Sequence, residues 1–220
     1  MKKFLLTAAL LFCTVLGFSQ TKFGVKGGLN FANIELESND FEDFSFSPSS
    51  RTSFHIGGFA EIGLGSTFVF QPALLLSGKG YKLDYSATEG GYSTSIDQTL
   101  SLYYLELPLN FVAKLDAGKG KFLIGAGPYA AYAIEGKSKG RLNFDGPGAQ
   151  EDASTPLNAD IKFGNNEDEI KPSDFGINFL AGYELKSGLL FNVGYGLGLS
   201  DLSNDSEKNK VLSLSIGFKF

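Results

Sequence analysis

Cysteine, histidine and long apolar runs are nearly absent from this sequence, and each scarcity narrows the class of protein. The single cysteine, Cys13, lies in an apolar segment near the N-terminus, and the single histidine is His55. Once residues 1–19 are removed, the chain can form no disulfide and offers no thiol nucleophile or thiolate metal ligand. No later run approaches the roughly 20 apolar residues that a membrane-spanning helix needs. A chain of this kind can cross a membrane only with strands.

The first 19 residues have the pattern of a secretory signal peptide. Two lysines precede an apolar run from Phe4 to Leu16, and small residues follow at positions 17 and 19. This order of charged, apolar and small residues is typical of a segment that is removed on export. We expect cleavage after Ser19, which leaves residues 20–220 as one domain.

Acidic side chains outnumber basic side chains in this sequence. The signal holds two lysines and no acid, so the remaining chain has 17 basic and 24 acidic side chains, a net charge of −7. Nucleic acid binding requires a basic surface, and nucleic acid is therefore not an expected partner.

Alternation of apolar and polar residues runs through the rest of the chain. The last ten residues, VLSLSIGFKF, are apolar at every even position, which gives a strand with one apolar face. The same period of two recurs at seven earlier places. The eight predicted strands are residues 21–34, 52–62, 67–83, 99–115, 121–134, 174–186, 189–200 and 211–220.

Two irregularities are expected within these strands. Pro72 lacks the N–H donor that a sheet needs, so it predicts a bulge or a poorly paired position. Leu100 and Leu102 fall on the polar face of the fourth strand, which predicts a bulge near Tyr103.

The connections alternate strictly between short and long. Short turns are expected at 63–66, 116–120 and 186–188, and they contain glycine, aspartate and serine. Long acidic loops are expected at 35–51, 84–98, 136–172 and 203–210. This pattern predicts an all-β fold, an eight-stranded antiparallel up-and-down transmembrane β-barrel in the outer membrane. Its short turns and both termini would be periplasmic and its longer loops extracellular.

The composition of the two faces indicates which one meets lipid. Glycines cluster on the polar face with only scattered charges, which suits a narrow interior better than a surface in water. The opposite face is rich in Phe, Leu, Ile and Tyr and has almost no charge, as a lipid-facing surface requires. A water-soluble barrel with an apolar interior is the disfavoured alternative.

An eight-stranded barrel has an interior just wide enough to be filled by its own side chains. The charges on the inward face have both signs, and an unpaired charge in such an interior is costly. We expect a lumenal polar network with a packing role; a path for protons or solutes is the alternative. Its predicted members are Lys22, Lys26, His55, Glu61, Lys79, Glu106, Lys114, Asp174, Glu184 and Lys219.

Patterns that would indicate catalysis or ligand binding are weak. Ser53 shares a face with His55, but a hydrogen-bonded structural histidine is the favoured interpretation. The acidic loop 136–172 lacks the spacing of a calcium-binding loop. The glycines at 194–198 lie in mid-strand with no helix after them, unlike a nucleotide-binding loop. We therefore expect no enzyme activity, no metal and no cofactor.

Several segments together resemble one family. They are KFGVKGGLNFANI, FQPALLLSGKGYKL, LYYLELPLNFVAKL, FLIGAGPYAAY and FGINFLAGYELKSGLLFNVGYGLGLSDL. The chain is similar along its whole mature length to the PorT-like outer-membrane β-barrel proteins of Bacteroidota. The resemblance implies insertion by the outer-membrane assembly machinery, with Phe218 and Phe220 as the assembly signal. The family's namesake is linked to protein secretion and gliding-related export. This chain has Pro-Ala-Leu-Leu-Leu at 72–76 where family members often have Pro-Glu-Leu-Leu-Tyr, so a role for that glutamate does not carry over.

The sequence thus predicts a monomeric, non-enzymatic barrel in outer-membrane lipid. It would act as a structural, interaction or secretion-associated component, with protein partners bound through loops 35–51, 84–98 and 136–172. The alternative is a narrow or gated porin-like channel for small solutes, which would conduct in a manner sensitive to Glu61, Glu106 or Lys26. An enzyme dependent on His55 is the third hypothesis.

Overall fold

The computed structural model describes residues 21–35, 49–89, 91–145, 154–166, 169–203 and 207–220. The expected signal peptide and most of loop 35–51 lie outside these residues. Within them, no helix is long and apolar enough to span a membrane. The strands are β1 (Lys22–Glu35), β2 (Ser49–Gly63), β3 (Phe68–Glu89), β4 (Tyr92–Ala117), β5 (Gly120–Asp145), β6 (Ser154–Asp160), β7 (Ser173–Leu185), β8 (Leu189–Gly198) and β9 (Lys208–Lys219).

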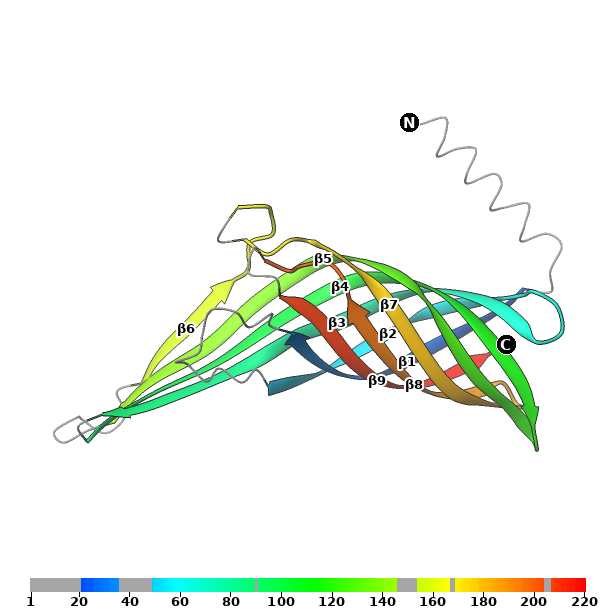
Figure 1. Cartoon of the computed structure of the whole chain (residues 1–220), viewed down its shortest axis with the longest axis horizontal. Coiled ribbons are helices and arrows are strands. Elements are labelled where there is room, and N and C mark those ends of the chain that lie inside the picture. The colour runs from blue at the N-terminus through cyan, green and yellow to red at the C-terminus, as the bar shows by residue number, and fades with distance from the viewer. Residues whose placement is uncertain (1–20, 36–48, 90, 146–153, 167–168, 204–206) are drawn as a thin grey trace, which may run out of the picture.

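Eight of these nine strands form a closed ring. Each pairs antiparallel with its neighbour in the order β1-β2-β3-β4-β5-β7-β8-β9, and β9 pairs back with β1 from Gly24↔Lys219 to Glu35↔Lys208. Figure 1 shows these strands winding obliquely around a common axis. The predicted eight-stranded antiparallel up-and-down barrel is confirmed. Closure gives every ring strand a partner on both sides, which a sheet in lipid requires.

One end of the barrel, the turn end, carries the three short connections between β2 and β3, β4 and β5, and β7 and β8. Each contains one glycine with a positive φ angle: Gly65 (106°), Gly118 (58°) and Gly188 (90°). Other residues adopt this conformation only with strain, which explains the glycine in each turn. The start of β1 and the end of β9 lie at this same end (Figure 1).

At the opposite end the sheet extends beyond the ring as a four-stranded projection. The β3–β4 ladder continues without interruption to Glu89↔Tyr92. β5 continues to Asp145, paired with β4 on one side and, from Lys137 to Asn143, with β6 on the other. Figure 1 shows this projection tapering to one side. The prediction that 84–98 is a loop is therefore wrong, and so is that prediction for much of 136–172. These segments are rich in Ser, Thr, Asp and Gly and have no strong apolar face, but their backbones still pair.

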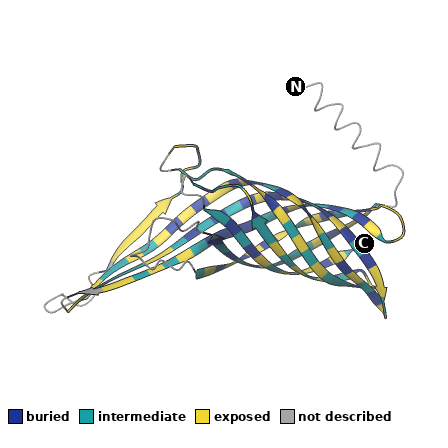
Figure 2. Cartoon of the chain, viewed as in Figure 1, coloured by how far each residue is buried: buried dark blue, intermediate teal, exposed yellow. Residues whose placement is uncertain are grey.

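Side chains on the ring strands alternate between lipid and lumen. On β5, Phe122 and Ile124 are 55% and 60% exposed, whereas Leu123 between them is 2% exposed. Figure 2 shows the same alternation as bands of exposed and buried residues along the barrel. Inward positions also include glycines at close approaches: a Cβ atom on Gly57 would lie 2.0 Å from the carbonyl oxygen of Leu74. The predicted apolar outward face and glycine-rich inward face are both present.

The two expected irregularities have different outcomes. Beside Pro72 the β2–β3 pairing is interrupted, but the register is the same before and after, so there is poor pairing without a bulge. The β4–β5 register does shift between Tyr103 and Tyr104, as expected. However, the extra residue is Ile134 of β5, because Tyr103 faces Glu135 and Tyr104 faces Ala133.

The lumen contains two apolar clusters. Because β4 itself has no bulge, Leu100 and Leu102 remain on the inward face, 7% and 0% exposed, and the expectation that a bulge in β4 displaces them is wrong. They belong to the cluster nearer the projection, where Ile161, Phe163 and Ile170 pack against it. The described part of 161–170 is thus a loop, as expected, but its apolar side chains pack against a cluster in the lumen. The second cluster is Phe59, Val69, Ala73, Leu75, Val112, Leu123 and Leu190.

Candidate functional site

The inward polar side chains gather in two layers of ion pairs separated by a small cavity. The layers lie at different levels of the lumen and join strands from opposite sides of the ring. Their geometry decides whether anything can pass through the barrel.

The turn-end ion layer consists of Glu61, Lys114, Glu184 and Lys219, which come from β2, β4, β7 and β9. Lys114 Nζ lies 2.8 Å from Glu61 Oε2, and Lys219 Nζ lies 3.0 Å from Glu61 Oε1. Both lysines also pair with Glu184. All four side chains are at most 11% exposed, and the two positive and two negative charges balance.

The projection-end ion layer is centred on Lys79 of β3. Its Nζ lies 2.8 Å from Glu106 Oε2 on β4 and 2.9 Å from Asp174 Oδ2 on β7. The ammonium also lies 4.3 Å from the centre of the Tyr129 ring and 5.2 Å from that of Tyr104. Lys79 thereby connects β3, β4, β5 and β7 across the lumen.

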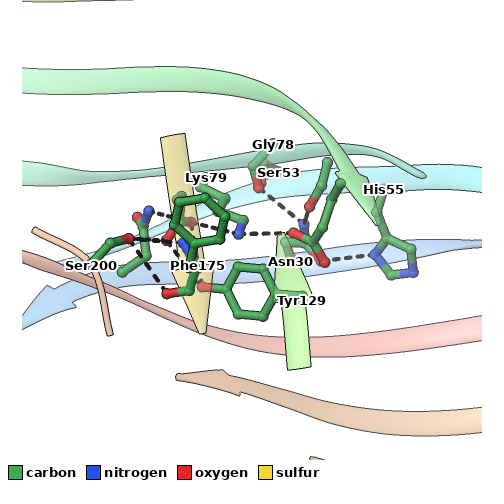
Figure 3. A network of polar contacts seen from close by, with 12 residues as sticks. Asn30, Ser53, His55, Gly78, Lys79, Tyr129, Phe175 and Ser200 are labelled. Carbon is green, nitrogen blue, oxygen red and sulfur yellow. Dashed lines mark hydrogen bonds and ion pairs between the residues drawn. The ribbon is translucent and has the colours of Figure 1, made fainter. Parts of the chain in front are cut away.

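Asp174 accepts more hydrogen bonds than the ion pair alone supplies. It is fully buried, and it accepts from Tyr129, Asn209 and Ser200, with donor distances of 3.2, 2.9 and 3.2 Å. The hydroxyl of Ser200 in turn accepts from the backbone N–H of Phe175 at 2.8 Å. Figure 3 shows Lys79, Tyr129 and Ser200 converging from different parts of the chain.

A cavity of about 80 Å³ lies between the two layers. His55 lines it, and its ring nitrogens contact Asn30 Oδ1 at 2.8 Å and Ser215 Oγ at 3.0 Å. Asn110 Oδ1 and Asn192 Oδ1 belong to cavity-lining residues and have no hydrogen-bond donor within the described part of the chain. The cavity is polar and large enough for a few water molecules, which could satisfy these oxygens.

Ser53 and His55 do not form the pair that a hydrolase would use. The hydroxyl of Ser53 donates to the carbonyl oxygen of Gly78 at 2.6 Å, whereas His55 contacts other partners. Figure 3 shows the two side chains directed to different neighbours. Among the described residues, no group of three or more His, Cys, Asp or Glu side chains could hold a metal ion.

Two residues singled out in the sequence stand apart from the layers. Lys22 shares the inward register, opposite Glu61, but its side chain is exposed at the turn end. Lys26 lines the cavity and interacts electrostatically with Glu106, but it belongs to neither ion layer. The remaining eight members lie in one of the layers or beside the cavity.

Sequence reasoning missed several participants. Arg51, assigned to a loop, belongs to β2; its guanidinium donates to the carbonyl oxygen of Lys79 at 3.0 Å and lies over Tyr103. Tyr104, Tyr129 and Asn209 carry no charge, so a search for inward charges passed over them. For Tyr104 and Tyr129, the inward face of β4 and β5 was the only available signal. Asn209 lies in β9, and the prediction that the loop 203–210 extends to residue 210 is wrong because β9 begins at Lys208.

A family model described as "Outer membrane protein beta-barrel domain" matches residues 18–204. A comparison with curated protein sequences finds no match.

Several solved structures are similar to this chain. Ail, the attachment invasion locus protein of Yersinia pestis, has a TM-score of 0.42 and 13% identity, over 90% of this chain and 98% of that one. Neisserial surface protein A has a TM-score of 0.43 and 11% identity, over 90% and 97%. OprG from Pseudomonas aeruginosa has a TM-score of 0.44 and 12% identity, over 92% and 97%.

Proposed function

This chain belongs to the outer membrane protein beta-barrel domain family and lies in the cell outer membrane, and on that premise we propose that it is a non-enzymatic barrel with a closed lumen that acts through its extracellular projection. The observation that carries the proposal is the pair of ion layers. Each spans the lumen with buried, ion-paired side chains, and the cavity between them is about 80 Å³.

Closure of the lumen follows from the cost of opening it. Moving Lys79 away from its carboxylates would leave buried charges unpaired, and breaking a buried ion pair typically costs about 3–5 kcal/mol. The same argument applies to the turn-end ion layer. Two such layers in series, with apolar clusters beside them, leave no continuous aqueous path for a solute.

The projection supplies a surface that a purely structural barrel would not need. On its lumen side, Leu83, Tyr85 and Ile96 are half-buried, and Phe144 and Leu157 are 52% and 43% exposed. Exposed apolar side chains gathered on one sheet face indicate a protein contact. The role in secretion implied by the resemblance to PorT-like proteins is a finer form of this proposal. Replacing residues 84–97 by a two-residue turn should then abolish export while leaving the barrel in the membrane; unchanged export would contradict that role.

The test is single-channel conductance of the refolded mature chain in planar bilayers. Heat-modifiable migration on a gel first establishes that the barrel is closed. We expect no steady, discrete channels from a correctly folded barrel. Such channels would contradict the closed lumen.

A channel is the second candidate, and the polar cavity beside Lys26 is the observation that favours it. In that case Lys26→Ala should change the conductance or ion preference of the channels. Lys119→Ala, which removes an exposed charge in the turn between β4 and β5, is the matched control and should not.

A further inference from the structure

The two faces of the projection differ in their surroundings. Leu100 and Ser138 are 7% and 6% exposed and face the lumen side. The opposite face continues the lipid-facing side of the barrel, where Leu105 and Ile134 are 46% and 57% exposed. This outer face is therefore continuous with the membrane-contacting surface of the ring.

One cross-strand row on the outer face consists of two lysines and two neutral polar residues. The register places Lys82 of β3 opposite Thr99 of β4, Thr99 opposite Lys139 of β5, and Lys139 opposite Asn158 of β6. We call these four residues the basic row. Adjacent strands are about 4.8 Å apart, so Lys82 and Lys139 are anchored roughly 10 Å from each other.

The neighbouring rows differ because each contains acidic side chains. On the membrane side of the basic row, Lys137 of β5 faces Asp160 of β6 and is also paired with Glu135 at 2.5 Å. On the far side, Arg141 faces Asp97 across the β4–β5 ladder, and Asp97 faces Asp84 of β3. Lys82 and Lys139 are thus the lysines of this face that have no acidic residue in their own row.

A surface hollow lies at the β5–β6 end of the basic row. Its volume is about 430 Å³, and it is lined by Asp97, Lys139, Gly140, Arg141, Pro156 and Asn158. Lys139, Arg141 and Asn158 can all donate to an anion, and Arg141 opposes the one carboxylate, Asp97. The hollow has room for a phosphate group together with part of its carrier.

The height of the basic row matches that of a lipid head group. Lys139 comes five residues after Ile134, the last apolar residue of the lipid-facing belt on β5, which is roughly 16 Å along a strand. Barrel strands are tilted, so the rise above the hydrocarbon is smaller than that distance. Lysines just beyond the apolar belt attract anionic head groups.

We propose that the basic row and its hollow bind the phosphate groups of the lipopolysaccharide head group in the outer leaflet. Two features support this occupant: the charge of the row complements phosphate, and its face is continuous with the surface that contacts lipid. The inference does not depend on whether the lumen is closed, so it and the proposed function can fail separately.

The test is titration of the refolded full chain, in uncharged detergent at low salt, with purified lipopolysaccharide. Lys82→Ser combined with Lys139→Ser should weaken binding by at least about tenfold. Lys119→Ser combined with Lys186→Ser removes the same charge from two exposed positions in the short turns and should change binding by less than about twofold. Heat-modifiable migration confirms that each variant is folded, and all four positions are exposed outside the barrel wall.

Two further arms identify the ligand. Lipopolysaccharide stripped of phosphate should bind the unaltered protein as weakly as the intact lipid binds the Lys82/Lys139 variant. Inorganic phosphate at millimolar concentration should not displace the lipid. The proposal is overturned if the Lys82/Lys139 variant binds like the unaltered protein, if both double variants lose affinity equally, or if free phosphate competes.

Discussion

Asp174 shows how much of the lumen depends on single side chains. It is fully buried and accepts from an ammonium, a phenol, an amide and a hydroxyl that come from four parts of the chain. Each donor would lose its partner if the carboxylate were removed. Replacing both partners of a buried ion pair by apolar residues changes the free energy of unfolding only modestly. Removing one partner leaves the other charge buried and unpaired, which is strongly destabilising.

Asp174→Ala is therefore expected to lower the free energy of unfolding by roughly 3 kcal/mol. Urea unfolding in detergent, followed by circular dichroism, measures the change. Asp116→Ala is the control, because it breaks the ion pair with Lys121, in which the Asp116 side chain is 87% exposed. That variant should lose less than about 1 kcal/mol. Equal losses in the two variants would show that the projection-end ion layer does not stabilise the barrel.

At the scale of elements, the bulge in β5 determines which side chains of the projection face outward. Before Ile134, odd-numbered residues of β5 face the lumen; after it, even-numbered residues such as Gly136 and Ser138 do. The ladder with β4 keeps its pairing on both sides of the extra residue. Lys139 of the basic row consequently faces away from the lumen.

Deletion of Ile134 should be tolerated, because the pairs Tyr103↔Glu135 and Tyr104↔Ala133 would then follow one another in a regular ladder. We expect the free energy of unfolding to change by less than about 1.5 kcal/mol, as for other changes that preserve facing and volume. Deletion of Ile124 is the comparison. It inverts the facing of the β5 residues on one side of the deletion, and the closed barrel should not form. Heat-modifiable migration after refolding distinguishes the two, and failure of both deletions would contradict the assignment of Ile134 as the extra residue.

At the scale of the whole molecule, the last strand closes the ring. β9 pairs with both β8 and β1, and the backbone N–H of Phe220 donates to the carbonyl oxygen of Phe23 at 2.9 Å. The Phe220 side chain itself is 71% exposed. Its ring therefore contributes little to packing within the barrel. This exposure is compatible with the proposed role of Phe220 in an assembly signal.

Phe220→Ala should separate assembly from folding. We expect the folded barrel in the outer membrane of expressing cells to fall several-fold, while refolding of the purified chain into detergent is unchanged. Phe191→Ala removes another outward phenylalanine, 44% exposed, and should leave both unchanged. Equal outer-membrane levels of Phe220→Ala and the unaltered chain would refute the assembly signal.

The sequence by itself determined the ring. Period-two alternation located all eight of its strands, and the scarcity of charge on one face identified the side that contacts lipid, because a barrel wall has only two faces and lipid excludes charge from one of them. It also identified the inward charges that make up both ion layers, since those charges follow the same alternation.

Only the tertiary structure decided the projection, the strand that carries the bulge and the partners within each layer. Residues 84–98 and 136–145 lack a strong apolar face. Their pairing depends on backbone hydrogen bonds, which a hydropathy pattern does not reveal. Register across the ring determines that Lys79 meets Asp174, 95 residues away, and that uncharged Tyr129 and Asn209 join them. Alternation specifies the face on which a side chain lies, whereas its partner is set by shear and closure of the barrel.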